Sequence, residues 1–342
     1  MIYLILFRKM RQLKDKYRKR FFSFITSMGK LNDHDVINLL KANFKNLNKI
    51  KGNSTLQCLF PNCRNIGVIS SHLYSKSFLK IIAENGKLYT KSHFPEIIGT
   101  NLEINLNEIG INEAMTFPGF CKSCENRFTF EKNLFFENSQ DYYLQLLRTV
   151  CYEKRLLEIE INSNSSLIKE ITSLSRNKLS HIFNPLGVKI ESISGVNSIE
   201  SFMMKRNKML LKQLQKVNRF YEKFCLAFND KFSIKIYVIK LPTSLPFFAN
   251  YVGSIRMRKF DKEIRCNTVI NIHPVGPMST EVFFTDFSKH LTINFFKHLS
   301  NEEQINFFAG ILKLSSSPLI QQKYWDTLTL ETQTEILKLD FF

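Results

Sequence analysis

The sequence predicts an α+β fold in which helices flank a small cysteine-rich module and a strand-rich C-terminal domain closes the chain. Three observations support this fold class. Two cysteine pairs lie in the first half of the chain, Cys58 with Cys63 and Cys121 with Cys124. Apolar residues recur at helical spacing over residues 139–160 and 198–228. Beyond residue 231, apolar and polar residues alternate in short runs, as they do in strands.

Length and composition indicate the domain organisation. The chain has 342 residues, which suggests two or three domains, and 44% of its residues are hydrophobic, enough for a buried core. We expect four regions along it. These are a basic helical arm at residues 1–51, the cysteine-rich module at 52–137, a helical region at 138–228 and a strand-rich α+β domain at 229–342.

The charge of the chain favours a polyanionic partner. Lys and Arg total 48 against 30 Asp and Glu, a formal net charge of +18. The excess is concentrated at the start, where residues 1–51 hold 13 Lys or Arg and 3 Asp, a net of +10. Such a field attracts nucleic acid and speeds its capture. The competing interpretation is that the arm tethers the protein to an anionic membrane surface or to a partner.

Membrane insertion is not expected from the sequence. No run approaches the roughly 20 apolar residues that cross a bilayer. The first seven residues are apolar and a basic run follows them, which reverses the order found in a signal peptide. We therefore expect a cytoplasmic protein. In that reducing compartment the seven cysteines would be metal ligands or free thiols rather than disulfides.

The spacing of the paired cysteines indicates a metal site. Four residues separate Cys58 from Cys63, and two separate Cys121 from Cys124, with turn residues beside each pair. Two short loops of this kind can place four thiolates around one zinc ion, which would be structural because its coordination shell is closed. The alternative is four unrelated buried thiols. Core positions are expected for the cysteines that lack such spacing, Cys151, Cys225 and Cys266.

Helices are expected around and after the module. One runs from Ser75 to Asn85 and ends at Gly86. Another covers residues 139–160, and a polar linker at 162–166 separates it from a long helix over 198–228. The long helix carries many basic residues: Lys205, Arg206, Lys208, Lys212, Lys216, Arg219 and Lys223. Such a set is usually a solvated helix face, and a secondary groove for phosphates is the alternative.

The C-terminal region reads as strands followed by short helices. Strands are expected over residues 232–238, 247–257, 268–273 and 281–286, with proline-containing turns between several of them. Two short helices should close the chain. The first begins with a capping box, in which Ser300 precedes Glu303 by three residues.

The segment between the cysteine pairs carries a family resemblance. An apolar run ends in His72, and a polar turn and a helix follow. The second pair opens the segment Phe120–Phe128, FCKSCENRF. Over residues 58–133 this order resembles the HNH, or ββα-metal, nuclease family. More narrowly, the Ser-His-x-x-Ser-Lys run and the Phe-Pro-Gly-Phe-Cys approach resemble a bacterial subgroup with a four-cysteine zinc site and a long C-terminal extension.

The resemblance implies roles for individual residues. His72 would be the general base that takes a proton from the attacking water. Glu125, just after the second pair, would ligate a catalytic Mg²⁺ or Mn²⁺, and Ser71 would be a second ligand. The zinc-stapled module would then have the ββα-metal architecture, with the zinc bracing the strand of His72 against the helix of Glu125.

The sequence departs from the family pattern at three points. Ser71 stands where the family has an acid or a histidine. The middle asparagine that orients the base is missing from its usual place, near Thr116, and Asn112 is the candidate substitute. The insertion between His72 and the second pair is long. These departures keep an alternative open, a catalytically inactive zinc-containing nucleic-acid-binding protein.

Taken with the resemblance, the sequence predicts a metal-dependent HNH-like endonuclease that hydrolyses phosphodiester bonds. Double-stranded DNA is favoured over RNA as its substrate. Lys76 and Arg127 are candidate phosphate contacts, although helix residues of this kind are often merely solvated. The strand-rich domain would recognise the substrate or a protein partner. The resemblance also implies a setting in anti-phage defence or on mobile elements.

Overall fold

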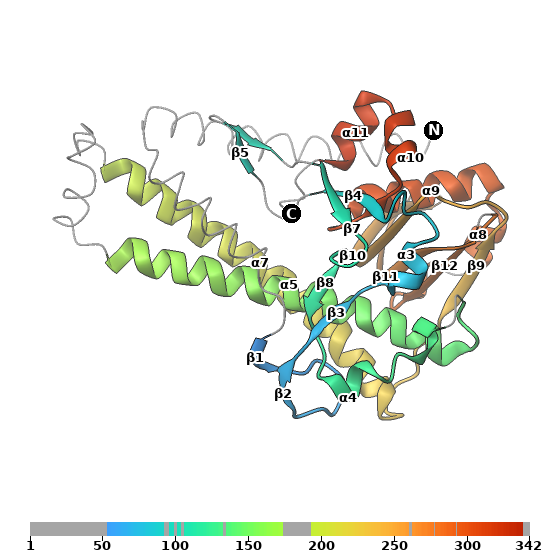
Figure 1. The fold of residues 1–342 in the computed structure, drawn as a ribbon, viewed down its shortest axis with the longest axis horizontal. Coiled ribbons are helices and arrows are strands. Elements are labelled where there is room, and N and C mark those ends of the chain that lie inside the picture. Colours follow the sequence, from blue (N-terminus) through green and yellow to red (C-terminus); the bar gives the residue numbers. More distant parts are fainter. Residues whose placement is uncertain are drawn as a thin grey trace.

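The structure is a computed structural model in which most of the chain beyond residue 52 is described. The described residues are 53–91, 96–98, 101–103, 106–132, 135–173, 193–259, 262–276, 278–291 and 293–337. The basic arm expected at residues 1–51 lies outside them, so its helical character stays a prediction. The fold is mixed α and β, as the sequence predicts, with one large antiparallel sheet at its centre (Figure 1).

The central sheet has seven strands in the order β7-β4-β13-β10-β11-β12-β9. Each neighbouring pair is antiparallel. The strands are β4 (Lys87–Lys91), β7 (Leu106–Gly110), β9 (Tyr237–Leu241), β10 (Phe247–Lys259), β11 (Lys262–Gly276), β12 (Ser279–Asp286) and β13 (Leu319–Ile320). Strands β4 and β7 come from the insertion between the two cysteine pairs. The sheet therefore crosses the boundaries expected at residues 137 and 228.

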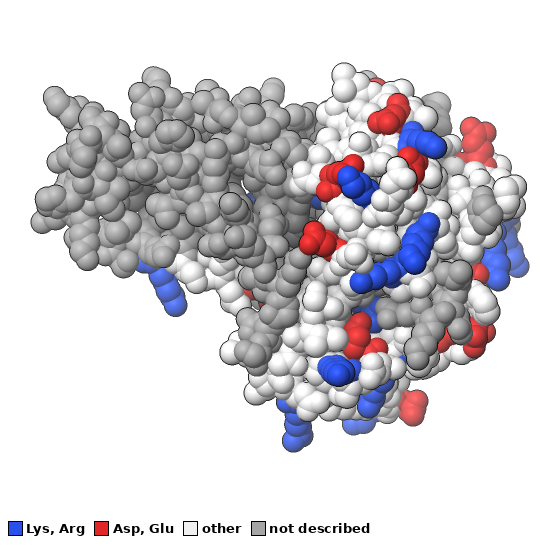
Figure 2. Space-filling view, in the orientation of Figure 1, with Lys and Arg blue, Asp and Glu red and all other residues white. Residues whose placement is uncertain are grey.

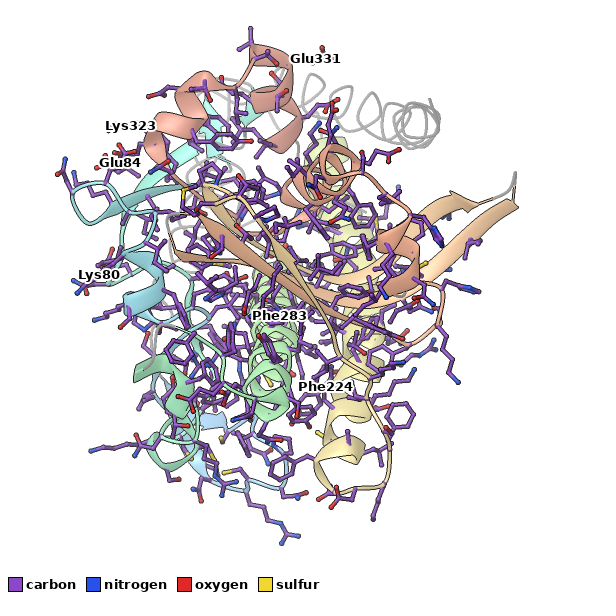
Figure 3. All side chains as sticks on the ribbon, turned by 90° about the vertical axis from the view of Figure 1, so that its right-hand side faces the viewer. Lys80, Glu84, Phe224, Phe283, Lys323 and Glu331 are labelled. Atoms are coloured by element: carbon purple, nitrogen blue, oxygen red, sulfur yellow. The ribbon has the colours of Figure 1, made fainter. Side chains whose placement is uncertain are left out.

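Alternation along the strands divides the interior into two cores. Phe283 faces a core shared with the long helices, whereas its neighbours Val282 and Phe284 face the core under the C-terminal helices. Phe248 and Phe247 divide in the same way. Successive side chains of a strand point to opposite faces, so a run of apolar residues fills both layers. Figure 3 shows Phe283 in the interior of the molecule.

Helices cover both faces of the sheet. On one face lie α5 (Ser139–Ser173) and α7 (Ile193–Phe228), which pack against each other and extend beyond the sheet (Figure 1). Tyr143 contacts Phe224 and Glu160 pairs with Arg206, so the two helices run antiparallel. The other face is covered by α8 (Ile293–Lys297), α9 (Asn301–Leu314), α10 (Gln322–Thr327) and α11 (Leu330–Ile336).

The polar linker predicted at residues 162–166 was wrong, because α5 continues through it. The neighbouring helix supplies the reason. Asn164 is fully buried, and Asn207 of α7 donates a hydrogen bond to Ser165 Oγ at 3.0 Å. Contacts with α7 therefore hold these polar residues in a helix, although their intrinsic helix propensity is low.

The cysteine-rich module consists of short elements around one buried cluster. It contains β1 (Asn53–Gln57) paired with β2 (Ile66–Val68), and β3 (Ser70–His72) paired with β8 (Thr116–Pro118). The remaining elements are α3 (Lys76–Leu79), α4 (Lys122–Glu125), the 3-10 turn η1 (Thr129–Lys132) and the pair of β5 (Glu96–Ile98) with β6 (Asn101–Glu103). The buried residues of this module belong to the same core as α5, α7 and one face of the sheet.

The helix predicted over Ser75–Asn85 was too long, because α3 ends at Leu79. Gly86 does not follow a helix. Instead Asn85 and Gly86 both have positive φ, and the backbone of Glu84 pairs with that of Lys87 around them. This is the pattern of a two-residue hairpin turn, in which Asn-Gly is favoured.

Most C-terminal predictions were confirmed. Strands β10, β11 and β12 cover the runs expected at 247–257, 268–273 and 281–286, and the Ser300 capping box opens α9. The strand expected at 232–238 was misplaced, because β9 begins at Tyr237, where β12 offers a partner. Within the described residues, no helix combines the length and the apolar composition that a bilayer-spanning segment requires.

Candidate functional site

Four cysteines converge on one point of the module. Cys58 and Cys63 come from the loop between β1 and β2, whereas Cys121 and Cys124 lie at the start of α4. Their sulfur atoms all lie within 4.8 Å of one another. This cluster can hold a metal such as zinc, which is commonly bound by four cysteine sulfurs at tetrahedral corners. Among the described residues it is the one converging group of three or more His, Cys, Asp or Glu side chains.

Hydrogen bonds to the sulfurs orient this cluster. The backbone amides of Phe60 and Cys121 donate to Cys58 Sγ at 3.5 and 3.3 Å. Asn65 Nδ2 donates to Cys121 Sγ at 3.4 Å, and the hydroxyl of Ser123 lies 3.2 Å from the same sulfur. Such donors stabilise thiolates and hold metal ligands in position. The first loop closes through Asn62, whose φ of 63° lies in the left-handed region where asparagine is tolerated.

The surroundings of the sulfurs act in opposite directions on ionisation. Burial raises the pKa of the Cys58 thiol to about 11. Burial also raises the pKa of Cys121, but hydrogen bonds from Ser123 and Asn65 outweigh it and lower that pKa to about 5. A bound dication would favour the thiolate at every position, because its charge is the largest in the site.

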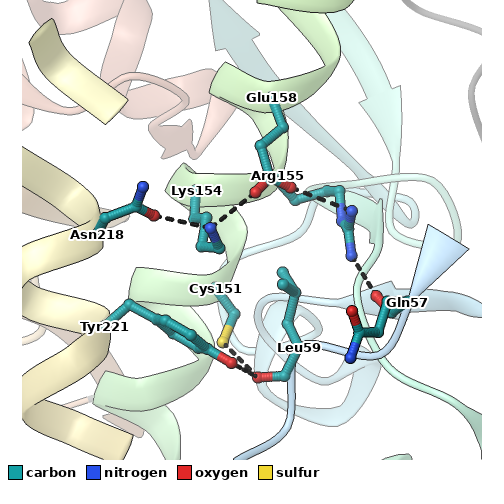
Figure 4. A network of polar contacts seen from close by, with 8 residues as sticks. All are labelled: Gln57, Leu59, Cys151, Lys154, Arg155, Glu158, Asn218 and Tyr221. Carbon is teal, nitrogen blue, oxygen red and sulfur yellow. Dashed lines mark hydrogen bonds and ion pairs between the residues drawn. The ribbon is translucent and has the colours of Figure 1, made fainter. Parts of the chain in front are cut away.

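Two long helices anchor the first cysteine loop (Figure 4). The carbonyl oxygen of Leu59 accepts hydrogen bonds from Tyr221 Oη of α7 at 2.9 Å and from Cys151 Sγ of α5 at 3.6 Å. Arg155 of α5 donates to the carbonyl oxygen of Gln57 at 2.6 Å. Helix α5 thus contacts the backbone on both sides of Cys58, and α7 contacts it at Leu59. The cysteine cluster is therefore built on the main core rather than suspended on a free loop.

The two residues expected to ligate the catalytic ion meet in the structure. Ser71 Oγ donates to Glu125 Oε2 at 2.7 Å, and Ser71 Oγ also accepts from the backbone amide of Phe120 at 3.3 Å. Ser71 is 1% exposed and the Glu125 side chain is 17% exposed. A carboxylate and a hydroxyl are hard oxygen ligands of the kind that Mg²⁺ and Mn²⁺ accept.

A third residue shares this carboxylate. Arg148 Nη2 lies 2.9 Å from Glu125 Oε1, and the Arg148 side chain is fully buried. Its guanidinium stacks over the ring of Phe128, with 3.8 Å between the guanidinium carbon and the ring centroid. Glu125 therefore compensates a buried cation. We did not predict this role, although an arginine between Leu147 and Cys151 on the apolar face of a helix was a visible signal.

His72 lies in the two-stranded ribbon of β3 and β8, in the same strand as Ser71. It is half-buried at the end of β3, directly opposite Thr116 of β8. Its Nε2 lies 3.1 Å from the backbone oxygen of Asn112, which can only accept, so Nε2 is the donor in this hydrogen bond. Alternation along β3 directs Ser71 inwards and His72 to the outer face.

The two candidate phosphate contacts lie at the surface. Lys76 is exposed at the start of α3, four residues after His72. Arg127 is exposed just after α4, and its guanidinium lies 4.8 Å from the centroid of the Phe60 ring. That contact fixes Arg127 beside the cysteine cluster, since Phe60 lies between Cys58 and Cys63.

No known family, no curated protein and no solved structure matches this chain.

Proposed function

We propose that the protein is a metal-dependent HNH-like endonuclease acting on nucleic acid, with DNA favoured over RNA. One observation carries the proposal. Ser71 of β3 and Glu125 of α4, which are 54 residues apart in the chain, meet at 2.7 Å, and His72 is the next residue of β3. The cysteine cluster, which would bind structural zinc, joins α4 to the loop between β1 and β2.

The remaining groups suit phosphodiester hydrolysis. Ser71 and Glu125 would hold a divalent ion, which when bound would supply neutralisation of charge at the scissile phosphate. His72 Nδ1 would take the proton of the attacking water, because the Asn112 carbonyl keeps the other ring nitrogen protonated. Lys76 and Arg127 would position the nucleic-acid backbone through contacts with phosphate.

The test is cleavage of supercoiled DNA by the full-length protein with added Mg²⁺ or Mn²⁺. We expect nicking that falls on the order of 100-fold or more in His72→Ala, the usual contribution of a general base. His298→Ala is the matched control, because His298 is an exposed histidine just after α8, outside the cysteine-rich module. Undiminished cleavage by His72→Ala would reject the proposed role of this residue. An RNA of the same sequence tests the preference for DNA.

The Arg148–Glu125 ion pair favours a second candidate function. A buried guanidinium beside the only acidic candidate ligand opposes the arrival of a further cation. The alternative is therefore a zinc-containing protein that binds nucleic acid without cleaving it. It predicts salt-sensitive DNA binding by the wild-type protein with no cleavage under either metal.

A further inference from the structure

Helix α7 carries a straight row of basic side chains. The row consists of Lys205, Lys208, Lys212, Lys216, Arg219 and Lys223, separated by three or four residues at each step. At about 3.6 residues per turn, this spacing keeps all six within an arc of about 80°. With a rise of about 1.5 Å per residue the row is about 27 Å long. Lys223 is half-buried and the other five are exposed.

The orientation of the row is set by the other side of the helix. Leu210, Val217, Phe220 and Phe224 are all buried, on the face that packs towards α5 and the sheet. Figure 3 shows Phe224 in the interior. Because the apolar face is held in the main core, the basic row is held facing away from it.

The composition of the row is unlike that of an ordinary solvated helix face. Such faces usually mix charges, because like charges three or four residues apart repel each other. Between residues 204 and 228 the helix has a single acid, Glu222. By contrast, acidic and basic side chains of the described residues are interspersed on the face in Figure 2. The row therefore costs helix stability in the unbound protein, and a polyanion would relieve that cost.

A pair of cationic side chains lies on the face of the sheet that α7 covers. Arg256 of β10 and Arg265 of β11 are direct cross-strand partners, and both are exposed. Like charges placed directly opposite each other destabilise a ribbon. Val252 lies on the same face of the ribbon as Arg256 and packs against the core that α7 covers. In addition, α7 contacts β10.

We propose that the α7 row, together with Arg256 and Arg265, is a second contact surface for the phosphate backbone of nucleic acid. The inference deepens the proposed function and rests on its nucleic-acid substrate. A length of about 27 Å spans roughly eight base pairs of duplex. Lysines and arginines in such a row bind phosphates without reading sequence, so the surface would hold the substrate while the cysteine-rich module acts on it.

The alternative occupant, an anionic membrane, fits the helix less well. A membrane-surface helix inserts a continuous apolar face between its basic flanks. The apolar face of α7 is already buried in the core. Three exposed apolar residues lie beside the row, Met204, Leu211 and Leu226. They do not form a continuous face, because the polar residues Gln215, Asn218 and Glu222 lie among them.

The test compares two triple variants of the full-length chain, both with His72→Ala to prevent cleavage. The first carries Lys208→Gln, Lys212→Gln and Lys216→Gln in the row. The matched control carries Lys289→Gln, Lys297→Gln and Lys323→Gln, three exposed lysines on other elements, and so has the same net charge. Binding to a labelled duplex of about 30 base pairs is followed by fluorescence anisotropy over a range of salt concentrations.

We expect the row variant to bind on the order of 100-fold more weakly near 0.1 M salt, with a salt slope lower by about 3. The control should keep wild-type affinity within about twofold, and thermal unfolding should show that the row variant is folded. Unchanged affinity of the row variant, or equal losses in both triples, would overturn the proposal. So would loss of binding to phosphatidylserine vesicles without loss of DNA binding. A wild-type protein that binds but never cleaves contradicts the nuclease and leaves this surface supported.

Discussion

Ser71 Oγ donates a 2.7 Å hydrogen bond to Glu125 Oε2, and the other oxygen of that carboxylate accepts from the fully buried Arg148. One carboxylate thus joins strand β3, helix α4 and helix α5. Its two contacts have different meanings for function. The Ser71 contact brings together two candidate ligands of a divalent ion, whereas the Arg148 contact satisfies a buried cation. Whether Glu125 can bind a divalent ion depends on the relative strength of these two contacts.

Breaking the Arg148–Glu125 pair should be costly. Arg148→Met leaves Glu125 partly buried without its counter-charge, and we expect a loss of about 3–5 kcal/mol in the free energy of unfolding. Adding Glu125→Gln should recover part of that loss. Urea denaturation of both single variants and the double variant measures the coupling. The control is the more exposed pair of Lys313 and Glu335, where Lys313→Met should cost less than about 1 kcal/mol. Strict additivity of the two single effects would show that the pair is not coupled.

The four cysteines should bind one metal ion that the fold requires. Elemental analysis of the purified protein should find one zinc per chain, and Cys121→Ser should lose it. Because structural zinc contributes on the order of 10 kcal/mol in small domains, the variant should lose several kcal/mol of stability. Cys225→Ser is the control, since Cys225 is half-buried and outside the cluster. Retention of zinc in Cys121→Ser, or its absence from the wild type, would contradict the site.

Buried His273 should make stability depend on pH. Burial lowers its pKa to about 3, and both ring nitrogens are buried without a hydrogen-bond partner in the described structure. Its neighbours are mainly aromatic rings, with Tyr74 at its edge and Glu281 across the ribbon. The fold therefore favours the neutral ring, whereas the unfolded chain takes up a proton below about pH 6.5. The stabilisation is complete above that pH and is lost as pH falls towards 3, by up to about 1.4 kcal/mol per pH unit.

His273→Leu tests this pH dependence. The difference in unfolding free energy between wild type and variant should shrink or reverse in favour of the variant as the pH falls from about 6.5 to about 5. His298→Leu, at an exposed histidine, should show no such trend. Parallel pH profiles for wild type and His273→Leu would mean that His273 does not contribute the expected linkage.

Two glycines should respond oppositely to alanine. Gly86 has a φ of +74°, so Gly86→Ala should destabilise the turn before β4 by about 1 kcal/mol, although no atom would contact the added methyl group within 4 Å. Gly310 lies inside α9 with equally open surroundings and no positive φ. Gly310→Ala should therefore stabilise the protein by up to about 1 kcal/mol. Thermal unfolding measures both, and a shift of the same sign in both variants would contradict this account.

Local sequence patterns predicted the elements that are stabilised locally. The capping box at Ser300 and the strands β10 to β12 depend on residues close together in the chain. The convergence of the cysteines was also predicted, because two short loops with paired thiols are typical of a site where four sulfurs bind one metal ion. The linker at 162–166 and the helix over Ser75–Asn85 were wrong because packing and hairpin pairing outweighed the local signals.

The sequence by itself determined the α+β class, the paired cysteines and the alternating strands, because each follows from the spacing of residues along the chain. Only the tertiary structure decided that Arg148 forms an ion pair with Glu125 and that β4 and β7 join the C-terminal sheet. It also decided that the basic face of α7 points away from the core. These depend on contacts between residues far apart in the chain. Such contacts are chosen by burial and charge compensation, which no local pattern records.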